Sequence, residues 1–461
     1  MDLECEEAGH DWDDQVFNML LLRAQRGELD AQFNMGRLYA EGLMGAQNYT
    51  KGAYWYKMAA EQGHSDAQNN LAILYKLGLG VEQDLDIALA LFDQAANNNN
   101  AVAQHNLALA YQDGMGVEVD PGQAFFWLKM AAQNGHSRAQ FDIGLKYSTG
   151  DGVSKDIAKA IEWYEKSAKS GFPHAKYVLG LRYSRGDGVE VDMERSHELL
   201  LAAAYGGHPR AKHEVAKQFE SGRGCGKDLK QAFYWYIKAA DEDLSDACLK
   251  VGEFYKNGIS CKADLPQAIA FLKRAADQGV VDAMMQLGEI YSLDTPPLSS
   301  ASKAFSEYFR AAESGDTEAQ YIVASKYVAG DGVQKGDKQA FYWYGESASN
   351  GHHRSQVALV ECFILGRGTP QDWKKAFRFC TEYAQGGNVG AQTRLGDMYL
   401  RGLGVPRDYL YAHAWLNLAS SSGDSEAQGL LDAIEMKLTR TQIGEAQRLA
   451  SKWQKGNPLS R

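Results

Sequence analysis

The sequence predicts an all-α solenoid, a fold in which short helical units stack in a row. Two observations lead to this prediction. One alanine position recurs at a constant step of 36 residues, and within each step an aliphatic residue is followed four positions later by an aromatic one. A repeat of this length cannot bury its apolar face alone, so each unit packs on its neighbours. The recurring residues are Ala31, Ala67, Ala103, Ala139, Ala175, Ala211, Ala247, Ala283, Ala319, Ala391 and Ala427, with Ser355 in the remaining place.

The first half of each repeat is predicted to be a helix. Met35 and Tyr39, like Leu71 and Tyr75, are four residues apart and therefore share one helical face. A small residue such as Gly36 lies between them and allows a partner helix to approach closely. Gly-x-Gly turns follow, in which the first glycine ends the helix in a left-handed conformation and the second eases the reversal. Because these glycines follow helices rather than strands, they do not indicate a phosphate-binding loop.

A second helix in each repeat is marked by an alanine and a tryptophan three residues apart, as in Ala124 and Trp127. The regular spacing favours a tryptophan that fills the gap between repeats over one that belongs to an aromatic cage for a cation. Most second helices end in glycine and a polar residue. In four repeats that residue is a histidine, at His64, His136, His208 and His352. These histidines lie at least two repeats apart, too far to share a metal ion, so we expect loop contacts near the next helix start.

Four segments are predicted along the chain. Residues 1–12 are acidic and lack periodicity, so we expect a flexible segment, and residues 13–30 form a capping helix. Eleven repeats fill residues 31–426. Residues 427–461 hold a partial repeat and a second capping helix, opened by a capping box at Thr439 and Gln442. Pro296 and Pro297 stiffen a loop in which the glycine turn is missing.

Composition limits the classes of partner. The net charge of −11 disfavours nucleic acids and anionic membranes, because neither supplies a counter-charge. No apolar run is long enough to span a bilayer, and the acidic start of the chain is unlike a signal peptide, so we expect a cytoplasmic protein without membrane insertion. The six cysteines include no Cys-x-x-Cys pair, which predicts reduced, partly buried thiols, no metal site and no cofactor.

These motifs, Ala-x-x-x-Leu-Gly-x-x-Tyr, Gly-x-Gly-Val and Lys-Ala-x-x-Trp-Tyr-x-Lys-Ala-Ala, resemble Sel1-like repeats, which are relatives of the tetratricopeptide repeat. The resemblance covers most of the chain, about residues 31–426. It implies a right-handed superhelix whose first helices line the concave face, and a role in protein scaffolding or peptide binding. A cysteine-rich branch of the family is secreted and held by disulfides. This chain lacks the paired cysteines of that branch.

Candidate ligand contacts can be placed by register from the buried aliphatic residue of each first helix. The residue directly before it, termed here the upstream groove position, is Asn34, Asn70, Asn106 or Asp142 in the first four repeats. Tetratricopeptide grooves often hold an extended peptide backbone with asparagines at this position, since an amide both donates and accepts. Two residues after the aliphatic lies the downstream groove position, which changes from apolar to acidic along the chain: Arg37, Ile73, Leu109, Leu145, Leu181, Glu253 and Glu289. If both positions face the groove, the partner presents an apolar anchor toward one end and basic residues toward the other. The alternative is a polar helix surface that only keeps the protein soluble.

The leading functional hypothesis is a non-catalytic adaptor that binds a protein or peptide in its groove. No catalytic residues are predicted, because no nucleophile with a base and no metal-ligand set is recognisable. Two alternatives from other classes stay open. One is a hydrolase acting on cell-wall or β-lactam substrates, and the other is a sensor whose superhelix responds to a small ligand. The oligomeric state is not predicted.

Overall fold

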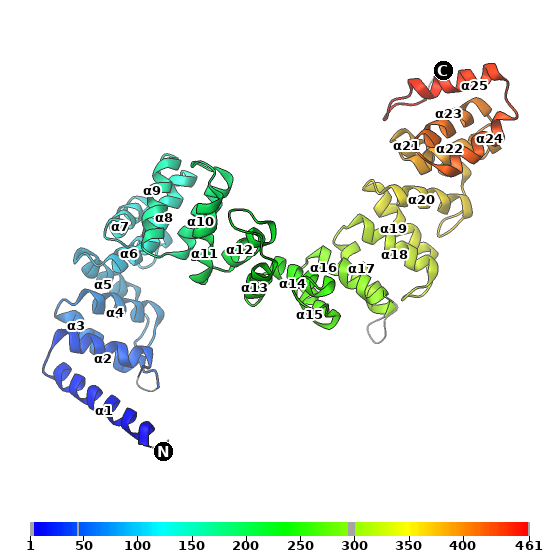
Figure 1. Ribbon diagram of the computed structural model, residues 1–461. Helices are drawn as coiled ribbons and strands as arrows, with labels where there is room; N and C mark the ends of the chain where they lie inside the picture. The colour runs from blue at the N-terminus through cyan, green and yellow to red at the C-terminus, as the bar shows by residue number, and fades with distance from the viewer. Residues whose placement is uncertain (1–3, 44–45, 294–299, 460–461) are drawn as a thin grey trace. The chain divides into compact units, whose positions relative to one another are not determined.

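The computed structural model describes residues 4–43, 46–293 and 300–459, and these residues form 25 helices (Figure 1). The first helices of the repeats are α2 (Leu29–Glu41), α4 (Ser65–Leu77), α6 (Ala101–Asp113), α8 (Ser137–Thr149), α10 (Pro173–Arg185), α12 (Pro209–Ser221), α14 (Ser245–Asn257), α16 (Val281–Ser292), α18 (Thr317–Ala329), α20 (His353–Leu365) and α22 (Val389–Arg401). The second helices are α3 (Tyr49–Glu61), α5 (Leu85–Asn97), α7 (Pro121–Gln133), α9 (Ile157–Lys169), α11 (Met193–Tyr205), α13 (Leu229–Ala240), α15 (Leu265–Asp277), α17 (Ala301–Glu313), α19 (Asp337–Ser349), α21 (Trp373–Gln385) and α23 (Tyr409–Ser421). The ends of the chain add α1 (Glu4–Gln25), α24 (Ser425–Glu435) and α25 (Arg440–Lys452). The predicted all-α solenoid of paired helices is confirmed. Within the described ranges, no helix is both long enough and apolar enough to cross a bilayer.

The chain divides into two compact halves, Met1–Lys238 and Ala239–Arg461. In each half, leaving aside the contacts of α13, in which the division falls, each first helix packs on its own second helix and on the second helix of the repeat before it. Some successive first helices also contact each other directly, as α2 does with α4, α4 with α6 and α20 with α22, and α22 contacts α24 in the same way. The side of each half that its first helices present is called here the first-helix surface.

The small residue inside most first helices is needed for close helix packing, as predicted. A Cβ atom at Gly36 would lie 2.4 Å from the ring of Tyr56, and one at Gly144 would lie 2.7 Å from the ring of Tyr164. At these distances the second helix would have to move away from the first. Gly36 and Gly144 therefore set the spacing of the two helices within a repeat.

The tryptophans of the second helices belong to the core, as predicted. Trp415 is 2 % exposed, and Trp127 is half-buried between the apolar clusters of two successive repeats. An indole at this position fills the space between neighbouring second helices with a large apolar surface. The regular spacing of the tryptophans thus comes from packing between repeats.

In the turn after α4 the two glycines have different roles. Gly78 ends α4 with φ +67°, and its N–H donates to the carbonyl of Leu74, so the predicted left-handed helix end is confirmed. The second glycine does more than ease the reversal. A Cβ atom at Gly80 would lie 2.3 Å from the carbonyl carbon of Tyr49, which belongs to the second helix of the preceding repeat. Gly80 therefore allows backbone from two repeats to meet, a role that the sequence analysis did not predict.

An aspartate caps most second helices and ties them to the first helix. In the third repeat the Asp120 N–H donates to the carbonyl of Tyr111 at 3.0 Å, and its carboxylate accepts from the N–H groups of Gly122 and Gln123. The same backbone link joins Tyr75 to Asp84. The first bond fixes the end of the turn, and the second satisfies amides that the helix leaves unpaired.

Replacing Asp120 by alanine is expected to destabilise α7 by about 1 kcal/mol, because two amide groups lose their acceptor. Asp120→Asn should stay within a few tenths of a kcal/mol of the wild type, since asparagine caps equally well. Hydrogen exchange of the α7 amides measures both values. Equal protection in the alanine variant and the wild type would contradict the role assigned to this cap.

The two ends of the chain differ from the repeats. Helix α1 begins at Glu4, within the segment that the sequence analysis expects to be flexible, and packs Phe17 and Leu21 against Met35. The capping box of α25 is present at Thr439 and Gln442. Helix α25 packs back on α23, the segment after it places Trp453 against Trp415, and the Gly456 N–H donates to the carbonyl of Gln385 at 2.7 Å. The loop containing Pro296 and Pro297 lies outside the described residues.

Candidate ligand-binding surface

Two of the upstream groove residues are joined in a chain of side-chain hydrogen bonds on the first-helix surface. The Asn106 amide donates to Asn69 Oδ1 at 2.8 Å, Asn69 donates to Asn70 Oδ1 at 3.1 Å, and Asn70 donates to the Tyr56 hydroxyl at 3.3 Å. Asn69, which is buried, was not among the predicted residues. Asn34 is exposed and lies outside this chain of bonds. Asn70 and Asn106 are therefore held in defined orientations by the protein itself.

Asp142 continues the same pattern with a histidine. The His105 Nε2 atom lies 3.0 Å from Asp142 Oδ2, and His105 occupies the repeat position of Asn69. The His105 ring lies 4.6 Å, between ring centroids, from that of His136. Burial, followed by the charge of His105, lowers the pKa of His136 to about 4. In the second and third repeats the residue just before the upstream groove position, Asn69 or His105, is thus the partner of the upstream groove residue of the next repeat. Its polarity at Asn69 and His105 was the signal available in the sequence.

The downstream groove residues have several environments. Arg37 pairs with Glu41 at 3.1 Å along its own helix. Ile73, Leu109 and Leu181 are half-buried, whereas Leu145 is exposed. An apolar strip at this register is therefore only partly open to a ligand.

The two acidic downstream residues are paired within the protein. Glu253 lies 2.9 Å from the Lys250 ammonium group and accepts a bond from Gln286 at 3.1 Å. Glu289 lies 2.8 Å from the ammonium group of Lys256 on the preceding first helix. These lysines offset much of the negative potential that a basic partner would meet.

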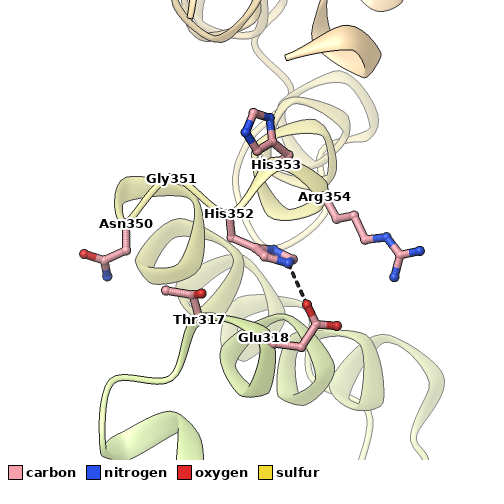
Figure 2. Close-up of a pocket in the computed structure, with 7 residues that line it drawn as sticks. All are labelled: Thr317, Glu318, Asn350, Gly351, His352, His353 and Arg354. Carbon is pink, nitrogen blue, oxygen red and sulfur yellow. Dashed lines mark hydrogen bonds and ion pairs between the residues drawn. The ribbon is translucent and has the colours of Figure 1, made fainter. Parts of the chain in front are cut away.

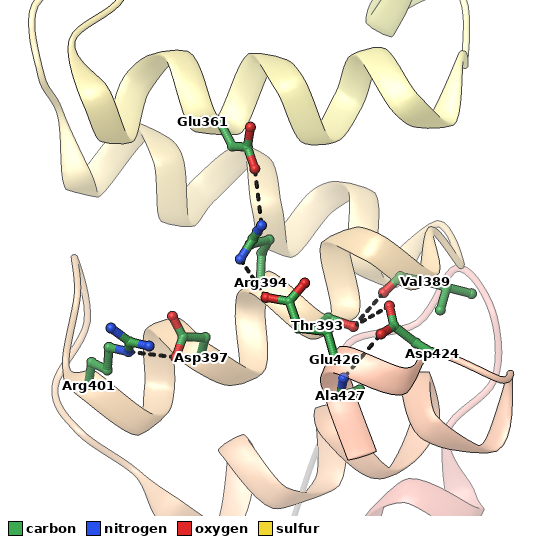
Figure 3. Close-up of polar contacts among 9 residues, drawn as sticks. All are labelled: Glu361, Val389, Thr393, Arg394, Asp397, Arg401, Asp424, Glu426 and Ala427. Carbon is green, nitrogen blue, oxygen red and sulfur yellow. Dashed lines mark hydrogen bonds and ion pairs between the residues drawn. The ribbon is translucent and has the colours of Figure 1, made fainter. Parts of the chain in front are cut away.

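Charged side chains also bridge α20, α22 and α24 near the end of the array (Figure 3). Arg394 of α22 reaches Glu361 of α20 at 3.1 Å and Glu426 of α24 at 2.9 Å. The Thr393 hydroxyl lies 3.0 Å from Asp424 Oδ2. The acidic groups here are therefore partly neutralised by one arginine.

Two adjoining hollows open on the first-helix surface of the C-terminal half, and the sequence analysis missed both. The hollow between α18 and α20 has a volume of about 450 Å³ and contains the Glu318–His352 contact of 2.8 Å (Figure 2). The hollow between α20 and α22 has a volume of about 590 Å³. His353 and Arg354 line both hollows, so they stand at the boundary between them.

A family model of the Sel1 repeat matches ten segments of this chain, each 36 residues long. Nine of them adjoin, and the tenth follows after a gap of one repeat. The matched residues are 29–64, 65–100, 101–136, 137–172, 173–208, 209–244, 245–280, 281–316, 317–352 and 389–424. The chain is a Sel1 repeat protein. The remaining window, residues 353–388, keeps both helices but has Ser355 and Val360 where other repeats carry alanine and a small residue.

A solved structure with an SLR fold resembles this protein over most of its length. The structure of c5321, a protective antigen of uropathogenic Escherichia coli with an SLR fold, is 30% identical and superposes with a TM-score of 0.78, covering 95% of this chain and 94% of its own. A Sel1 repeat protein from Oxalobacter formigenes is 27% identical, with a TM-score of 0.47, and covers 75% of this chain and 89% of its own. A search of curated protein sequences returned no match. The Sel1 repeat is a scaffold fold for protein interactions and is usually non-catalytic.

A glutamine that is buried, or half-buried at Gln356, links successive repeats in this Sel1 repeat protein. It follows the recurring alanine, or Ser355 in the tenth repeat, and its amide donates to a carbonyl at the end of the preceding helix. This bond satisfies an oxygen that the helix leaves unpaired. The donors are Gln32, Gln68, Gln104, Gln140, Gln320, Gln356 and Gln392, and the acceptors are Ala24, Ala60, Ala96, Ala132, Ala312, Ala348 and Ala384.

Two repeats reach the same carbonyl by another route. Cys248 and Met284 occupy the glutamine position in the seventh and eighth repeats. There the guanidinium groups of Arg274 and Arg310, which lie on the following second helices, donate to the carbonyls of Ala240 and Ala276. In these two repeats an arginine on the second helix therefore takes the place of the glutamine that other repeats carry on the first helix.

The four repeat-end histidines cap first helices, which confirms the predicted loop contacts. The Nδ1 atoms of His64, His136 and His208 accept from the N–H groups three residues on, at 3.2–3.3 Å, and His352 does the same with Ser355. An accepting Nδ1 requires the neutral ring with its proton on Nε2. Among the described residues, no three histidine, cysteine or acidic side chains gather in a way that could hold a metal ion.

The five cysteines with described side chains are free thiols, at Cys225, Cys248, Cys261, Cys362 and Cys380. Burial raises the pKa of Cys362 to about 11 and that of Cys380 to about 12. Both thiols therefore stay protonated at neutral pH and are weak nucleophiles.

Proposed function

We propose that this Sel1 repeat protein is a non-catalytic adaptor that binds a protein or peptide along its first-helix surface. The observation that supports this most directly is the set of side-chain contacts that run from one first helix to the next. Asn69 with Asn106, His105 with Asp142, and Glu253 with Gln286 each join neighbouring repeats. Such contacts hold donors and acceptors at a regular spacing, which suits an extended peptide backbone.

The residues proposed for this role are the upstream and downstream groove positions of the sequence analysis. Asn70 and Asn106 are the best candidates because their amides are oriented by Asn69 and Tyr56. Each half-buried amide keeps hydrogen-bonding capacity beyond the bonds described, since an amide has two donors and two acceptor lone pairs. A protein or peptide partner is proposed without nucleic acid, cofactor or metal.

A double substitution tests the proposal. Asn70→Ala with Asn106→Ala is expected to reduce recovery of the principal partner about tenfold or more in affinity purification with quantitative mass spectrometry, because several backbone contacts are lost. Circular dichroism should show unchanged helicity. The matched control replaces exposed amides of second helices, Asn97→Ala with Gln123→Ala, and should recover the partner at the wild-type level. Equal recovery by both double variants would show that the asparagines do not bind the partner.

A further inference from the structure

We propose that the first-helix surface of α18, α20 and α22 binds an acidic peptide segment. A carboxylate of the segment lies against Arg354, and a neighbouring aliphatic side chain packs on Val357, Ala358 and Val389. This inference rests on the proposed function and adds a location and a partner chemistry to it. The sequence analysis expects a basic partner for the acidic part of the groove. Here the partner is acidic instead, because the exposed Arg354 is unpaired and the nearby Glu361 is paired with Arg394.

Arg354 is the cation that this surface leaves open to a ligand. It is exposed, and within the described part of the chain its guanidinium group makes no ion pair; its recorded contact is with the Tyr321 ring, at 6.0 Å from the centroid. Figure 2 shows its side chain extending away from the Glu318–His352 contact. A guanidinium group offers five N–H donors in a planar fork that matches a carboxylate.

The acidic groups near Arg354 are used elsewhere. Glu361 lines the larger hollow but pairs with Arg394 at 3.1 Å, and Glu318 lines the smaller one but contacts His352 at 2.8 Å. An incoming carboxylate therefore meets an unpaired cation and, in the larger hollow, an anion that Arg394 offsets. The neutral His352 ring donates to Glu318 but does not offset its charge, so the carboxylate is placed in the larger hollow rather than beside Glu318. The net charge of −11 acts on the partner mainly at longer range, where salt screens it beyond about 8 Å at physiological ionic strength.

The floor of the larger hollow is apolar and shallow. Val357, Ala358 and Val389 line it and are half-buried, and Gly390 brings the start of α22 close to α20. A Cβ atom at Gly390 would lie 2.9 Å from Val357 Cγ2. Ala358 occupies the upstream groove position at which Asn70 and Asn106 stand in the N-terminal half. A small aliphatic side chain of the peptide fits this depression and removes its apolar surface from water.

The starts of two helices add to the attraction for a carboxylate. Helix α20 begins at His353 and α22 at Val389, and the residues at both starts line the larger hollow. The first amides of a helix have no acceptor within it and carry the positive end of its dipole. They support the role of Arg354, whose unpaired charge and apolar surroundings carry the inference.

The repeat beside the hollows also has an incomplete hydrogen-bond pattern. In the first three repeats the glutamine oxygens of Gln32, Gln68 and Gln104 accept a bond from an amide thirty residues on. In the ninth repeat the equivalent residue, Asn350, lines the smaller hollow and donates to the carbonyl of Glu346 instead. Gln320 Oε1 is consequently buried without a partner among the described residues. Such departures from an internal pattern are expected where side chains serve a ligand.

The test uses a phage-displayed library of random heptapeptides selected on the immobilised full chain. Selected peptides are expected to carry an aspartate or glutamate with an aliphatic residue close by, and synthetic copies should bind in fluorescence polarisation. Arg354→Glu should weaken that binding about tenfold or more, since a charge-assisted pair becomes a repulsion. Val357→Asp should weaken it similarly by placing a charge on the apolar floor.

The matched control is Arg378→Glu on α21. Arg378 is also exposed and also lies over an aromatic ring, Phe379, at 5.0 Å, but it belongs to a second helix. It should leave the affinity unchanged. In a double-mutant cycle, replacing the peptide acid by its amide should weaken binding to the wild type and have no further effect on Arg354→Ala.

Selected peptides without acidic residues, or equal effects of Arg354→Glu and Arg378→Glu, would overturn the inference. The proposed function is judged separately. If the natural partner depends on Asn70 and Asn106 but not on Arg354, the adaptor stands and this site is wrong. If the natural partner is indifferent to substitutions on the whole first-helix surface, both proposals fail.

Discussion

Acidification from pH 7 to about pH 4 is expected to destabilise the helices around His136 and His208 by about 2–3 kcal/mol for each histidine. Burial lowers the pKa of both side chains to about 4, and in each case a neighbouring histidine, His105 or His174, adds to the effect. Arg138 and Arg210 act in the same direction, while Asp142 opposes the shift at His136.

The direction of the effect follows from proton binding. The unfolded chain binds a proton to each histidine near pH 6.5, whereas the folded chain does so only near pH 4. The contribution of each of these two histidines to the free energy of unfolding is therefore constant above about pH 6.5, falls as the pH drops toward 4, and levels off below that value. Protonation at Nδ1 also removes the acceptor that caps α8 or α12.

Asparagine offers a matched replacement, because Asn100 and Asn388 already occupy this repeat position and cap their helices. The variant His136→Asn with His208→Asn should match the wild type at pH 7 within about 1 kcal/mol and lose much less stability by pH 4.5. Hydrogen exchange of the α8 and α12 amides measures this locally, which suits a repeat array that need not unfold in one step. An unchanged pH slope in the variant would contradict the assignment.

The second large effect is expected at Gly80. Gly80→Ala should destabilise the first two repeats by about 2–5 kcal/mol, of which about 1–2 comes from the left-handed backbone and the rest from overpacking. The added Cβ atom would lie 2.3 Å from the carbonyl carbon of Tyr49 and 2.4 Å from the Thr50 nitrogen. Both are backbone atoms of α3, so no side-chain rotation relieves the contact.

Gly152 provides the control for backbone strain alone. It has the same repeat position and the same φ of +71°, but a Cβ atom there would meet nothing within 4 Å. Gly152→Ala should therefore cost only about 1–2 kcal/mol. Urea denaturation, with exchange of the α3 and α4 amides as the local measure, distinguishes the two variants. Equal losses would show that the backbone contact between repeats is not important.

Features confined to one repeat or recurring in each could be predicted from the sequence. The helix pairs, the small residue at Gly36 and the packing of Trp127 follow from spacing along one helix, and the period multiplies the signal. Asn69 and His105 were missed because their partners lie on the first helix of the next repeat. The spacing of residues within one repeat does not show which side chains face each other in two neighbouring repeats.

The candidate site was harder to predict. The hollow beside Arg354 depends on small side chains at Ala358 and Gly390, and missing volume leaves no periodic mark in a sequence. The pairing of Glu253 with Lys250 also depends on rotamers that register alone does not fix. The position of α25 against α23 arises where the repeat pattern stops, so no neighbouring repeat could indicate it.

The two ways of satisfying the end of a second helix bear on how such arrays can be recombined. Where Arg274 and Arg310 reach the carbonyls of Ala240 and Ala276, the donor comes from the second helix of the following repeat rather than from its first. A chimaera in which the second helix of the seventh or eighth repeat is replaced by one without this arginine would remove that donor, and at Ala240 only the Cys248 thiol, at 4.0 Å, would remain. Cassettes cut from this protein are consequently not interchangeable at those junctions unless a glutamine is introduced at Cys248 or Met284 together with the swap.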